Sequence, residues 1–440
     1  MRTPSQFHGG NFQSQFDRLM CPRRMDKIIQ DFGPAKRRPP QLALDQLISS
    51  LVFHVLQDSG TFAVNVKQLT GQPISDSALS QRRATIPLMV FEEIMDGALS
   101  AKADPTQHPG AFYQGRRLLG IDGSQFSVSN TPQNKQTFIK AASRRMKAAF
   151  GKVGVSVLTE LGLHNPVAAT VGAAGMSEQE LSGPLLGKLP PGSLLLGDRA
   201  YGLGCWVKRI QEMYPAGDRD FLLRVKSTCK TKVLEVFPDG SAWVEIEVAG
   251  ERLQLRELRG RVRRPGGKWS EVRLWTSLRD WQKCPAGELL ALYGRRWEQE
   301  LFYKELKVDM RSAELLQSHT EVTAAQEIAA LLLAHAILVE QRMAAAEGEV
   351  DVLRISFRKT RHYLEPLWLI LQCSAGLLSQ RQVHELTRRV MVQIAEGALP
   401  PRRKRSCPRA VRKPIGSWPR LVRNTYQKGE TEWTVSLIEK

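Results

Sequence analysis

The chain has few of the features that mark secreted, membrane or thiolate-metal proteins. It contains six cysteines in 440 residues, and no two of them have the spacing of a C-x2-C or other zinc-ligand pair. They are expected to be free thiols in a reducing compartment. The first residues, MRTPSQFHGGNF, contain no apolar signal-peptide core. The longest apolar stretch, residues 328–339, is interrupted by His335 and is too short to span a bilayer. These absences predict a soluble, cytoplasmic protein.

Acidic residues are also scarce relative to basic ones. The chain has 44 Asp and Glu against 63 Lys and Arg, which gives a net charge of +19 and a pI of about 9.9. An enzyme of small metabolites does not need such a charge. A polyanion partner explains it, because each neutralised phosphate releases bound counterions. Residues 401–423 hold nine Lys or Arg and no acid, for which a merely solvated tail is the alternative explanation.

Hydrophobic periodicity divides the chain into five segments. Residues 1–105 are predicted to be a helical N-terminal region. Residues 106–226 alternate strands with helices, and residues 227–270 have the pattern of β-hairpins. Residues 271–345 are predicted to contain a strand and a long helix. Residues 346–440 are predicted to be helical before the basic tail.

The order of the predicted elements suggests a fold. Three antiparallel strands are followed by a helix, a strand, a helix and a strand, then the hairpins, a further strand and the long helix. This is the order of an RNase H-like α/β catalytic core that carries a β-rich insertion before its last helix. The predicted fold class is therefore α/β, with helical N-terminal and C-terminal regions.

The long helix, predicted over residues 286–310, carries polar chemistry on one face. Tyr293, Arg296, Glu300 and Lys307 fall at about 0°, 300°, 340° and 320° around a regular helix axis. Their spacing is Y-x2-R-x3-E-x6-K, and their neighbours on both sides are apolar. A buried charge is costly unless a partner, metal or ligand compensates it, so this stripe is predicted to be a functional site.

The remaining charges of that helix are predicted to face solvent. Arg295, Glu298 and Glu305 fall at roughly 120–200°, the side opposite the stripe. Charged residues on such a face commonly form solvated or i,i+4-paired surfaces.

Three carboxylates stand where a metal-dependent phosphodiesterase core would place them. Asp122 follows the apolar run Leu118–Ile121, Asp198 follows Leu194–Gly197, and Glu300 lies in the stripe. Hard divalent cations bind carboxylate oxygens, and two such cations can activate a nucleophile and stabilise a leaving oxygen. Each acid alone has a structural alternative: a turn at Asp122-Gly123, a turn or a pair with Arg199 for Asp198, and an i,i+4 pair with Lys304 for Glu300.

Taken together, these motifs resemble a known family. The stripe matches the signature of the DDE transposases of bacterial insertion sequences, in the insertion-sequence-four type with the Y-x2-R-x3-E-x6-K pattern. Ile121-Asp-Gly-Ser124 and Asp198-Arg-Ala-Tyr201 resemble the family's first and second aspartate motifs, and Thr276-Ser-Leu278 resembles the strand end before its third acid. The resemblance covers about residues 70–340. Asn130 stands where many relatives have an acid.

The resemblance implies a mechanism and a set of roles. Asp122, Asp198 and Glu300 would hold two Mg²⁺ ions, for which Mn²⁺ can substitute. Water would cut a phosphodiester at the transposon end, and the released 3′-hydroxyl would attack target DNA. The other stripe residues, Tyr293, Arg296 and Lys307, would hold the phosphate beside the scissile bond; an Arg fork, a Lys charge and a Tyr hydroxyl suit that role independently.

The implied partners are DNA and a second copy of the chain. Double-stranded terminal inverted repeats and target DNA would be bound, with a homodimer in the synaptic complex and association with the bacterial nucleoid when bound to DNA. Arg82 and Arg83, on a predicted short helix beginning near Asp76 or Ser77, would help recognise the repeat; a structural role for them is the alternative.

Three other functions remain open from the sequence. The chain could be a catalytically inactive relative that only binds DNA, although all three acids and the complete stripe are present. It could be a metal-dependent DNA nuclease without strand transfer, which would use the same residues. It could also be a basic RNA-binding protein whose carboxylates are structural.

Overall fold

The computed structural model divides into two compact units, which are described separately. Unit 1 comprises residues Met1–Ser193 and Trp297–Leu399, and unit 2 comprises Leu194–Arg296 and Pro400–Lys440. The residues whose structure is described are 10–35, 40–57, 60–138, 149–172, 176–263, 268–311, 313–346, 350–400, 405–406, 427–428 and 432–436.

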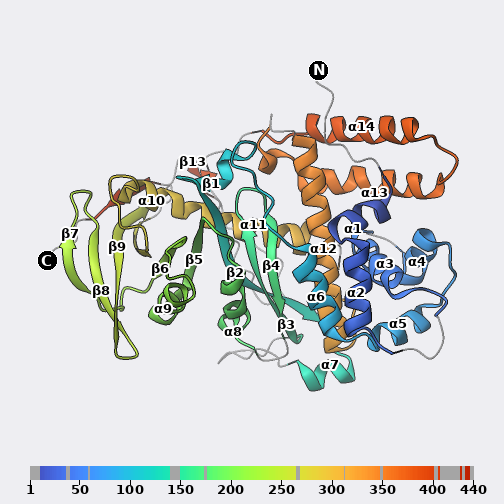
Figure 1. The fold of residues 1–440 in the computed structure, drawn as a ribbon, viewed down its shortest axis with the longest axis horizontal. Coiled ribbons are helices and arrows are strands. Elements are labelled where there is room, and N and C mark those ends of the chain that lie inside the picture. The colour runs from blue at the N-terminus through green and yellow to red at the C-terminus, as the bar shows by residue number, and fades with distance from the viewer. Residues whose placement is uncertain are drawn as a thin grey trace. The chain divides into compact units, whose positions relative to one another are not determined.

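The N-terminal part of unit 1 is helical, as the periodicity predicts (Figure 1). Its helices are α1 (Phe12–Leu19), α2 (Pro22–Phe32), α3 (Leu44–Leu56), α4 (Phe62–Thr70), α5 (Asp76–Ala84) and α6 (Leu88–Ala98). Several begin at a capping side chain, because the first amides of a helix have no partner within it. The side chains of Asn11, Thr61 and Ser75 accept from the backbone N–H of Ser14, Val64 and Ala78.

A long helix forms the centre of unit 1. Helix α12 (Glu321–Ala346) contacts α3, α6 and strand β4 (Asn165–Val171), and also α13 (Phe357–Cys373) and α14 (Gln380–Glu396). It is long and apolar enough to cross a membrane, but 94% of its apolar window is buried inside the protein. The helix is therefore part of the core. The expectation that the apolar stretch around His335 is too short to span a bilayer is wrong for the helix as a whole, which extends beyond residues 328–339 at both ends.

The sheet of unit 1 places the first candidate acid. Strands β2 (Arg116–Val128), β3 (Lys152–Glu160) and β4 form an antiparallel meander, with β1 (Phe112–Tyr113) and β11 (Leu315–Leu316) added to β2. Asp122 lies opposite Val157 in a continuous register. The turn proposed as the alternative at Asp122-Gly123 is therefore wrong: the pair lies within a strand.

Further short elements complete unit 1. They are η1 (Pro109–Ala111), α7 (Pro132–Thr137), α8 (Glu178–Ser182), η2 (Gly183–Lys188), α11 (Trp297–Lys304), the π-helical turn η4 (Glu305–Asp309) and η5 (Val352–Arg354). Residues 178–188 form an α-helix followed by a 3-10 helix. Pro184, within the second of these segments, has no N–H for an α-helical bond.

Unit 2 is built on a mixed sheet. Its strands occur in the order β5 (Ser193–Gly202), β6 (Arg219–Val225), β10 (Trp269–Thr276), β9 (Glu251–Arg263), β8 (Ala242–Val248) and β7 (Lys232–Val236), with β14 (Glu432–Val435) antiparallel to β9. The unit also contains α9 (Gly204–Met213), α10 (Ala286–Tyr293), η3 (Gly294–Arg296) and the short pair β12 (Arg405–Ser406) and β13 (Gln427–Lys428).

Paired buried charges fix the hairpins of unit 2. Arg256 is fully buried and donates to Ser241 Oγ at 2.8 Å and to the carbonyl of Cys284 at 2.7 Å, and it pairs with Asp239. Such a cluster stabilises the fold only when every donor and acceptor is used. The predicted RNase H-like fold class is confirmed in its mixed α/β character, with a β-rich region and helical flanks.

Candidate active site

Asp122 and Glu300 lie on two elements of unit 1 that are bonded to each other. The Tyr303 hydroxyl, on α11, donates to the backbone carbonyl of Asp122 at 2.7 Å. Gln299, also on α11, donates to the carbonyl of Val157 on the neighbouring strand at 3.2 Å. Both acids are half-buried. The strand that carries the first acid is therefore tied directly to the helix that carries the third.

The backbone around Asp122 is held in place from several sides. Ser156 Oγ donates to the same Asp122 carbonyl at 3.2 Å, and the N–H of Gly123 donates to Asp122 Oδ1 at 2.9 Å. The same N–H also donates to Glu178 Oε1 at 3.1 Å. A Cβ at Gly123 would lie 2.3 Å from Cγ of Glu178. Any larger residue beside the acid would therefore force the exposed Glu178 side chain to move.

The predicted long helix is not one regular helix. It consists of α10, the 3-10 turn η3, α11 and the π-helical turn η4. A 3-10 turn advances by about 120° per residue and a π turn by less than an α-helix, so the angular positions calculated for a continuous α-helix do not hold across them. The boundary between the units falls after Arg296. Tyr293 and Arg296 therefore belong to unit 2, and Glu300 and Lys307 to unit 1.

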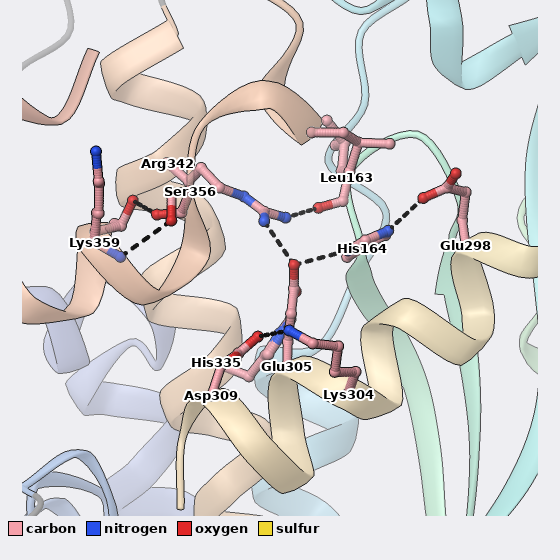
Figure 2. A network of polar contacts seen from close by, with 12 residues as sticks. Leu163, His164, Glu298, Lys304, Glu305, Asp309, His335, Arg342, Ser356 and Lys359 are labelled. Atoms are coloured by element: carbon pink, nitrogen blue, oxygen red, sulfur yellow. Dashed lines mark hydrogen bonds and ion pairs between the residues drawn. The ribbon is translucent and has the colours of Figure 1, made fainter. Parts of the chain in front are cut away.

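Two glutamates that were expected on the solvent face are instead buried. Glu298 is 6% exposed and Glu305 is 8% exposed. His164 lies between them, with Nε2 2.9 Å from Glu298 Oε2 and Nδ1 2.9 Å from Glu305 Oε1 (Figure 2). The expectation of an outward face at Glu298 and Glu305 is therefore wrong, because buried cations compensate both charges.

The network extends from Glu305 to α12. Arg342 Nη1 donates to Glu305 Oε1 at 2.9 Å, and its Nη2 donates to the carbonyl of Leu163. His335 Nε2 lies 3.0 Å from Glu305 Oε2 (Figure 2). Burial alone would raise the pKa of Glu305, but Arg342 and His164 hold it well below its usual range. Burial alone would lower the pKa of His164, yet the two glutamates raise it.

Lys307 lies in a group of cations at the end of η4. Its ammonium donates to the carbonyl of Gln125 at 2.8 Å and lies 5.2 Å from the centre of the Phe126 ring. The guanidinium of Arg311 is 5.4 Å from the same ring centre. Burial, together with the charges of Lys152 and Arg311, lowers the pKa of Lys307 to about 8. Among the described residues these three cations form no ion pair with a carboxylate, so an anion bound here would be stabilised.

Asp198 and Tyr293 lie within unit 2. Asp198 is inside β5 instead of following a short strand, and its Oδ1 accepts from the N–H of Ala200 at 2.6 Å. Tyr293 is buried, and its hydroxyl has no hydrogen-bond partner among the described residues. Burial raises the pKa of Tyr293 to about 12 against the opposing effects of Arg296 and Arg224, while Asp198 adds to the rise. These groups are therefore close enough to influence one another.

The two arginines expected to contact DNA differ in their surroundings. Arg83 donates to Ser318 Oγ at 3.3 Å, to the carbonyl of Thr323 at 3.0 Å and to Gln326 Oε1 at 3.4 Å. These bonds attach α5 to the start of α12. Arg82 is half-buried, and partial burial lowers its pKa. The basic side chains of the tail at 401–423 lie outside the described residues, apart from the backbone of Arg405 in β12.

The candidate metal ligands have suitable chemistry but are divided between the units. Asp122 and Glu300 are in unit 1 and Asp198 is in unit 2. Within the described part of either unit, no group of three His, Cys, Asp or Glu side chains is placed to hold a metal. The acids are half-buried oxygen donors, which is the donor type that hard divalent cations prefer.

Comparison with known proteins identifies the class to which this fold and these motifs belong. A model of the transposase DDE domain matches residues 113–337, just over half of the 440-residue chain. The chain therefore belongs to the DDE transposase family, and it is a DDE-type DNA transposase. Members of this family use divalent metal ions and act on DNA.

A curated relative places the chain within that family. Transposase InsG for insertion sequence element IS4, from Escherichia coli (strain K12), is 24% identical over 414 residues, which are 90% of this chain and 91% of that protein. The predicted resemblance to the insertion-sequence-four type is thereby confirmed. A cryo-EM structure of the piggyBac transposase synaptic complex with hairpin DNA is 9% identical with a TM-score of 0.44, and covers 86% of this chain and 85% of that one. The assignment rests on the first two comparisons.

Sequence patterns did not reveal the residues that hold α11 and η4 in place. Tyr303, His164 and Arg342 were not predicted to take part in the site. One available signal was His335, a titratable residue that interrupts an otherwise apolar stretch. Another was the Gly162-Leu-His-Asn165 turn, in which His164 adopts a φ of +57°, a conformation uncommon for residues other than glycine.

Proposed function

We propose that this transposase catalyses cut-and-paste transposition of an insertion sequence. It would bind terminal inverted repeats, hydrolyse the phosphodiester at the transposon end and join the released 3′-hydroxyl to target DNA. In the first step a water oxygen bonds to phosphorus as the bond to the 3′-oxygen breaks. The observation that carries the proposal is the complete Y-x2-R-x3-E-x6-K signature within a matched DDE domain, whose first and third acid-bearing elements are joined by Tyr303.

Asp122, Asp198 and Glu300 are proposed as the catalytic carboxylates and the ligands of two Mg²⁺ ions, with Mn²⁺ able to substitute. When bound, the ions would lower the pKa of the attacking water and neutralise charge that develops on the leaving oxygen. The oxygen donors and half-buried positions of the three side chains support this role. The hydrogen bonds to the Asp122 carbonyl and the bond from Gly123 to its carboxylate orient that residue before any ligand binds.

Tyr293, Arg296 and Lys307 are proposed to bind DNA phosphates beside the scissile bond. Lys307 has no carboxylate partner among the described residues and is close to two other cations, so a phosphate would relieve their mutual repulsion. Tyr293 is protonated at neutral pH, and its raised pKa of about 12 extends this state to higher pH, so its hydroxyl can donate to a phosphate oxygen. Arg296 offers a planar pair of donors.

Further DNA contacts and assembly follow from charge and family. Arg82, with Arg83 beside it, is proposed to contact the inverted repeat, and the basic tail to contact phosphates without sequence preference. Pairing of two transposon ends suggests a homodimer in the synaptic complex. A chain with a net charge of +19 that binds DNA would associate with the nucleoid.

The test is cleavage of a labelled duplex that carries the element's own terminal repeat. Wild type is compared with Glu300→Ala in Mg²⁺, and with Glu93→Ala as a control for loss of a half-buried helical glutamate in the same unit. Wild type and the control should cut at the repeat end, and Glu300→Ala should bind without cutting. Equal cutting by all three would remove Glu300 from the mechanism.

The same assay separates the alternatives. Binding without cutting by the wild type would indicate an inactive DNA-binding relative. Cutting that never yields joined products when target DNA is added would indicate a nuclease without strand transfer. Equal binding of unrelated RNA would favour the RNA-binding alternative.

A further inference from the structure

The helix α11, which carries Glu300, contacts a buried ion cluster through Glu298, and the adjoining turn η4 contacts the same cluster through Glu305. Within α11, Glu300 follows Glu298 by two residues and therefore lies about 200° from it around the helix axis, while Glu305 is the first residue of the π-helical turn η4. His164 bonds to both flanking glutamates at 2.9 Å. The histidine therefore contacts the side of the helix opposite to the direction in which Glu300 projects.

The pattern of acceptors around His164 determines its protonation state. An ionised carboxylate can only accept, and each ring nitrogen faces a carboxylate oxygen. With both glutamates assigned as ionised, both nitrogens carry a proton and the ring is an imidazolium, in agreement with the raised pKa of His164. His335 donates through Nε2, while its Nδ1 has no partner within the described residues, so it is assigned as neutral. With Arg342 the cluster then contains two cations and two anions.

Charge balance lowers the cost of burying this cluster, and its hydrogen bonds favour one rotation of the helix. A buried ion pair adds little net stability compared with apolar packing, but removal of one member leaves an uncompensated charge. Apolar side chains can pack in several rotations of a helix, whereas His164 satisfies both glutamates only when α11 and η4 have one rotation. The hydrogen bonds of Gln299 and Tyr303 to β3 and β2 attach the same helix to the sheet.

We propose that His164 is a positioning residue for transposition chemistry: by bridging Glu298 and Glu305 it fixes the rotation of α11 and hence the place of the Glu300 carboxylate. This rests on the proposed function of Glu300. A misplacement of about 1 Å can lower a rate about 100-fold. Loss of the bridge is therefore expected to slow cleavage about 10- to 100-fold without loss of DNA binding.

The experiment compares wild type, His164→Gln and Glu160→Gln as full-length chains. Glu160 is the matched control because it is fully buried at the end of the same hairpin, where it accepts from the N–H groups of Lys102 and Ala103. Among the described residues, none of its hydrogen bonds reaches α11. Three quantities are measured for each protein: the dissociation constant for terminal-repeat DNA, the single-turnover cleavage rate, and Mn²⁺ binding to the uncleaved complex by electron paramagnetic resonance.

His164→Gln is expected to bind DNA within about twofold of wild type, to need several-fold more Mn²⁺ for half-saturation and to cut 10- to 100-fold more slowly. Glu160→Gln should lower the melting temperature without changing Mn²⁺ half-saturation. A His164→Gln protein with wild-type Mn²⁺ binding and cleavage would overturn the inference. So would an equal Mn²⁺ shift in Glu160→Gln, since that would show a general effect of destabilisation.

A second variant covers the case in which His164→Gln folds poorly. His164→Gln/Glu298→Gln removes one cation and one anion, so charge balance returns while the bridge stays absent. It should recover thermal stability but not Mn²⁺ affinity; recovery of both would show that the cluster only balances charge.

If the wild type does not cut while Mn²⁺ and DNA are bound, the proposed function fails and this inference with it. Cutting by wild type but not by Glu300→Ala, with normal cutting by both His164 variants, would remove the positioning role alone.

Discussion

The hydroxyl of Tyr303 and the backbone carbonyl of Asp122 are joined by a 2.7 Å hydrogen bond that links α11 to β2. Tyr303 is buried, and burial raises its pKa well above its usual range, with a further contribution from Asp122. The hydroxyl therefore remains a donor throughout the physiological pH range. Through this bond a side chain on the helix of Glu300 determines the place of the strand of Asp122.

Tyr303→Phe should lower both stability and the cleavage rate. It removes one buried hydrogen bond, worth about 1 kcal/mol, and leaves the carbonyl with the longer bond from Ser156. We expect a fall in melting temperature of a few degrees and a roughly 5- to 20-fold slower single-turnover cleavage. Tyr363→Phe, on α13, is the control and should leave cleavage unchanged. An unchanged rate in Tyr303→Phe would show that the bond does not position Asp122.

DNA binding should weaken as the pH rises above 8. The pKa of Lys307 is lowered to about 8 in the free protein, so the ammonium is charged below that pH and neutral above it. Binding of a phosphate favours the charged form, so above pH 8 complex formation must take up a proton. The dissociation constant should then rise by up to about tenfold per pH unit. Fluorescence anisotropy between pH 6.5 and 9.5 measures it.

Lys307→Arg is the matched variant for this pH dependence. The guanidinium stays charged throughout the range, so the Lys307 contribution to the slope above pH 8 should disappear. A slope that persists unchanged in Lys307→Arg would assign it to another group. A wild-type dissociation constant that stays constant between pH 8 and 9.5 would contradict the lowered pKa of Lys307.

Tyr293→Phe should lower the cleavage rate while leaving the free energy of unfolding nearly unchanged. The hydroxyl is buried without a partner in the described part of the chain, so its removal should change the free energy of unfolding by less than about 1 kcal/mol, and in the stabilising direction if at all. If the hydroxyl donates to a phosphate, cleavage should fall roughly 10-fold. Because the pKa of Tyr293 is about 12, this loss should be the same from pH 6 to 9. Chemical denaturation and single-turnover cleavage give the two quantities.

Arg82→Ala and Arg83→Ala should have different consequences. Arg83 makes three hydrogen bonds to the segment at the start of α12, so its loss should cost about 2 kcal/mol or more of stability. Arg82→Ala should change stability by less than about 0.5 kcal/mol and weaken repeat binding, with a smaller dependence of the dissociation constant on salt. Equal destabilisation by both variants would show that the pair is structural.

Individual helices and strands were predictable where a hydrophobic pattern among neighbouring residues defines them. The apolar run before Asp122 lies in the segment predicted to alternate strands with helices, and it is part of strand β2, which spans Arg116–Val128. The region predicted to be helical over residues 1–105 contains helices such as α3 and α6. Hydrophobic period depends only on neighbouring residues, so a single sequence contains enough information for such elements.

The buried partners of Glu298 and Glu305 were not predictable in the same way. Sequence position suggested that Glu298 and Glu305 face solvent, because glutamates are rarely buried. Their partner His164 is 134 and 141 residues away, and Arg342 is 37 residues from Glu305. Compensation of a charge by a distant residue leaves no local pattern. The 3-10 and π turns that interrupt the helix are set by the same packing, and a uniform 100° period cannot represent them.

The cluster of His164, Glu298, Glu305 and Arg342 also constrains how this protein can change during evolution. Any single replacement that removes one charge leaves the buried cluster with a net charge, which is costly in a protein interior. Substitutions should therefore be accepted in pairs that remove opposite charges together. Among homologues, these positions should covary although three separate parts of the chain supply them, and a lineage that has lost one member should have lost its partner as well.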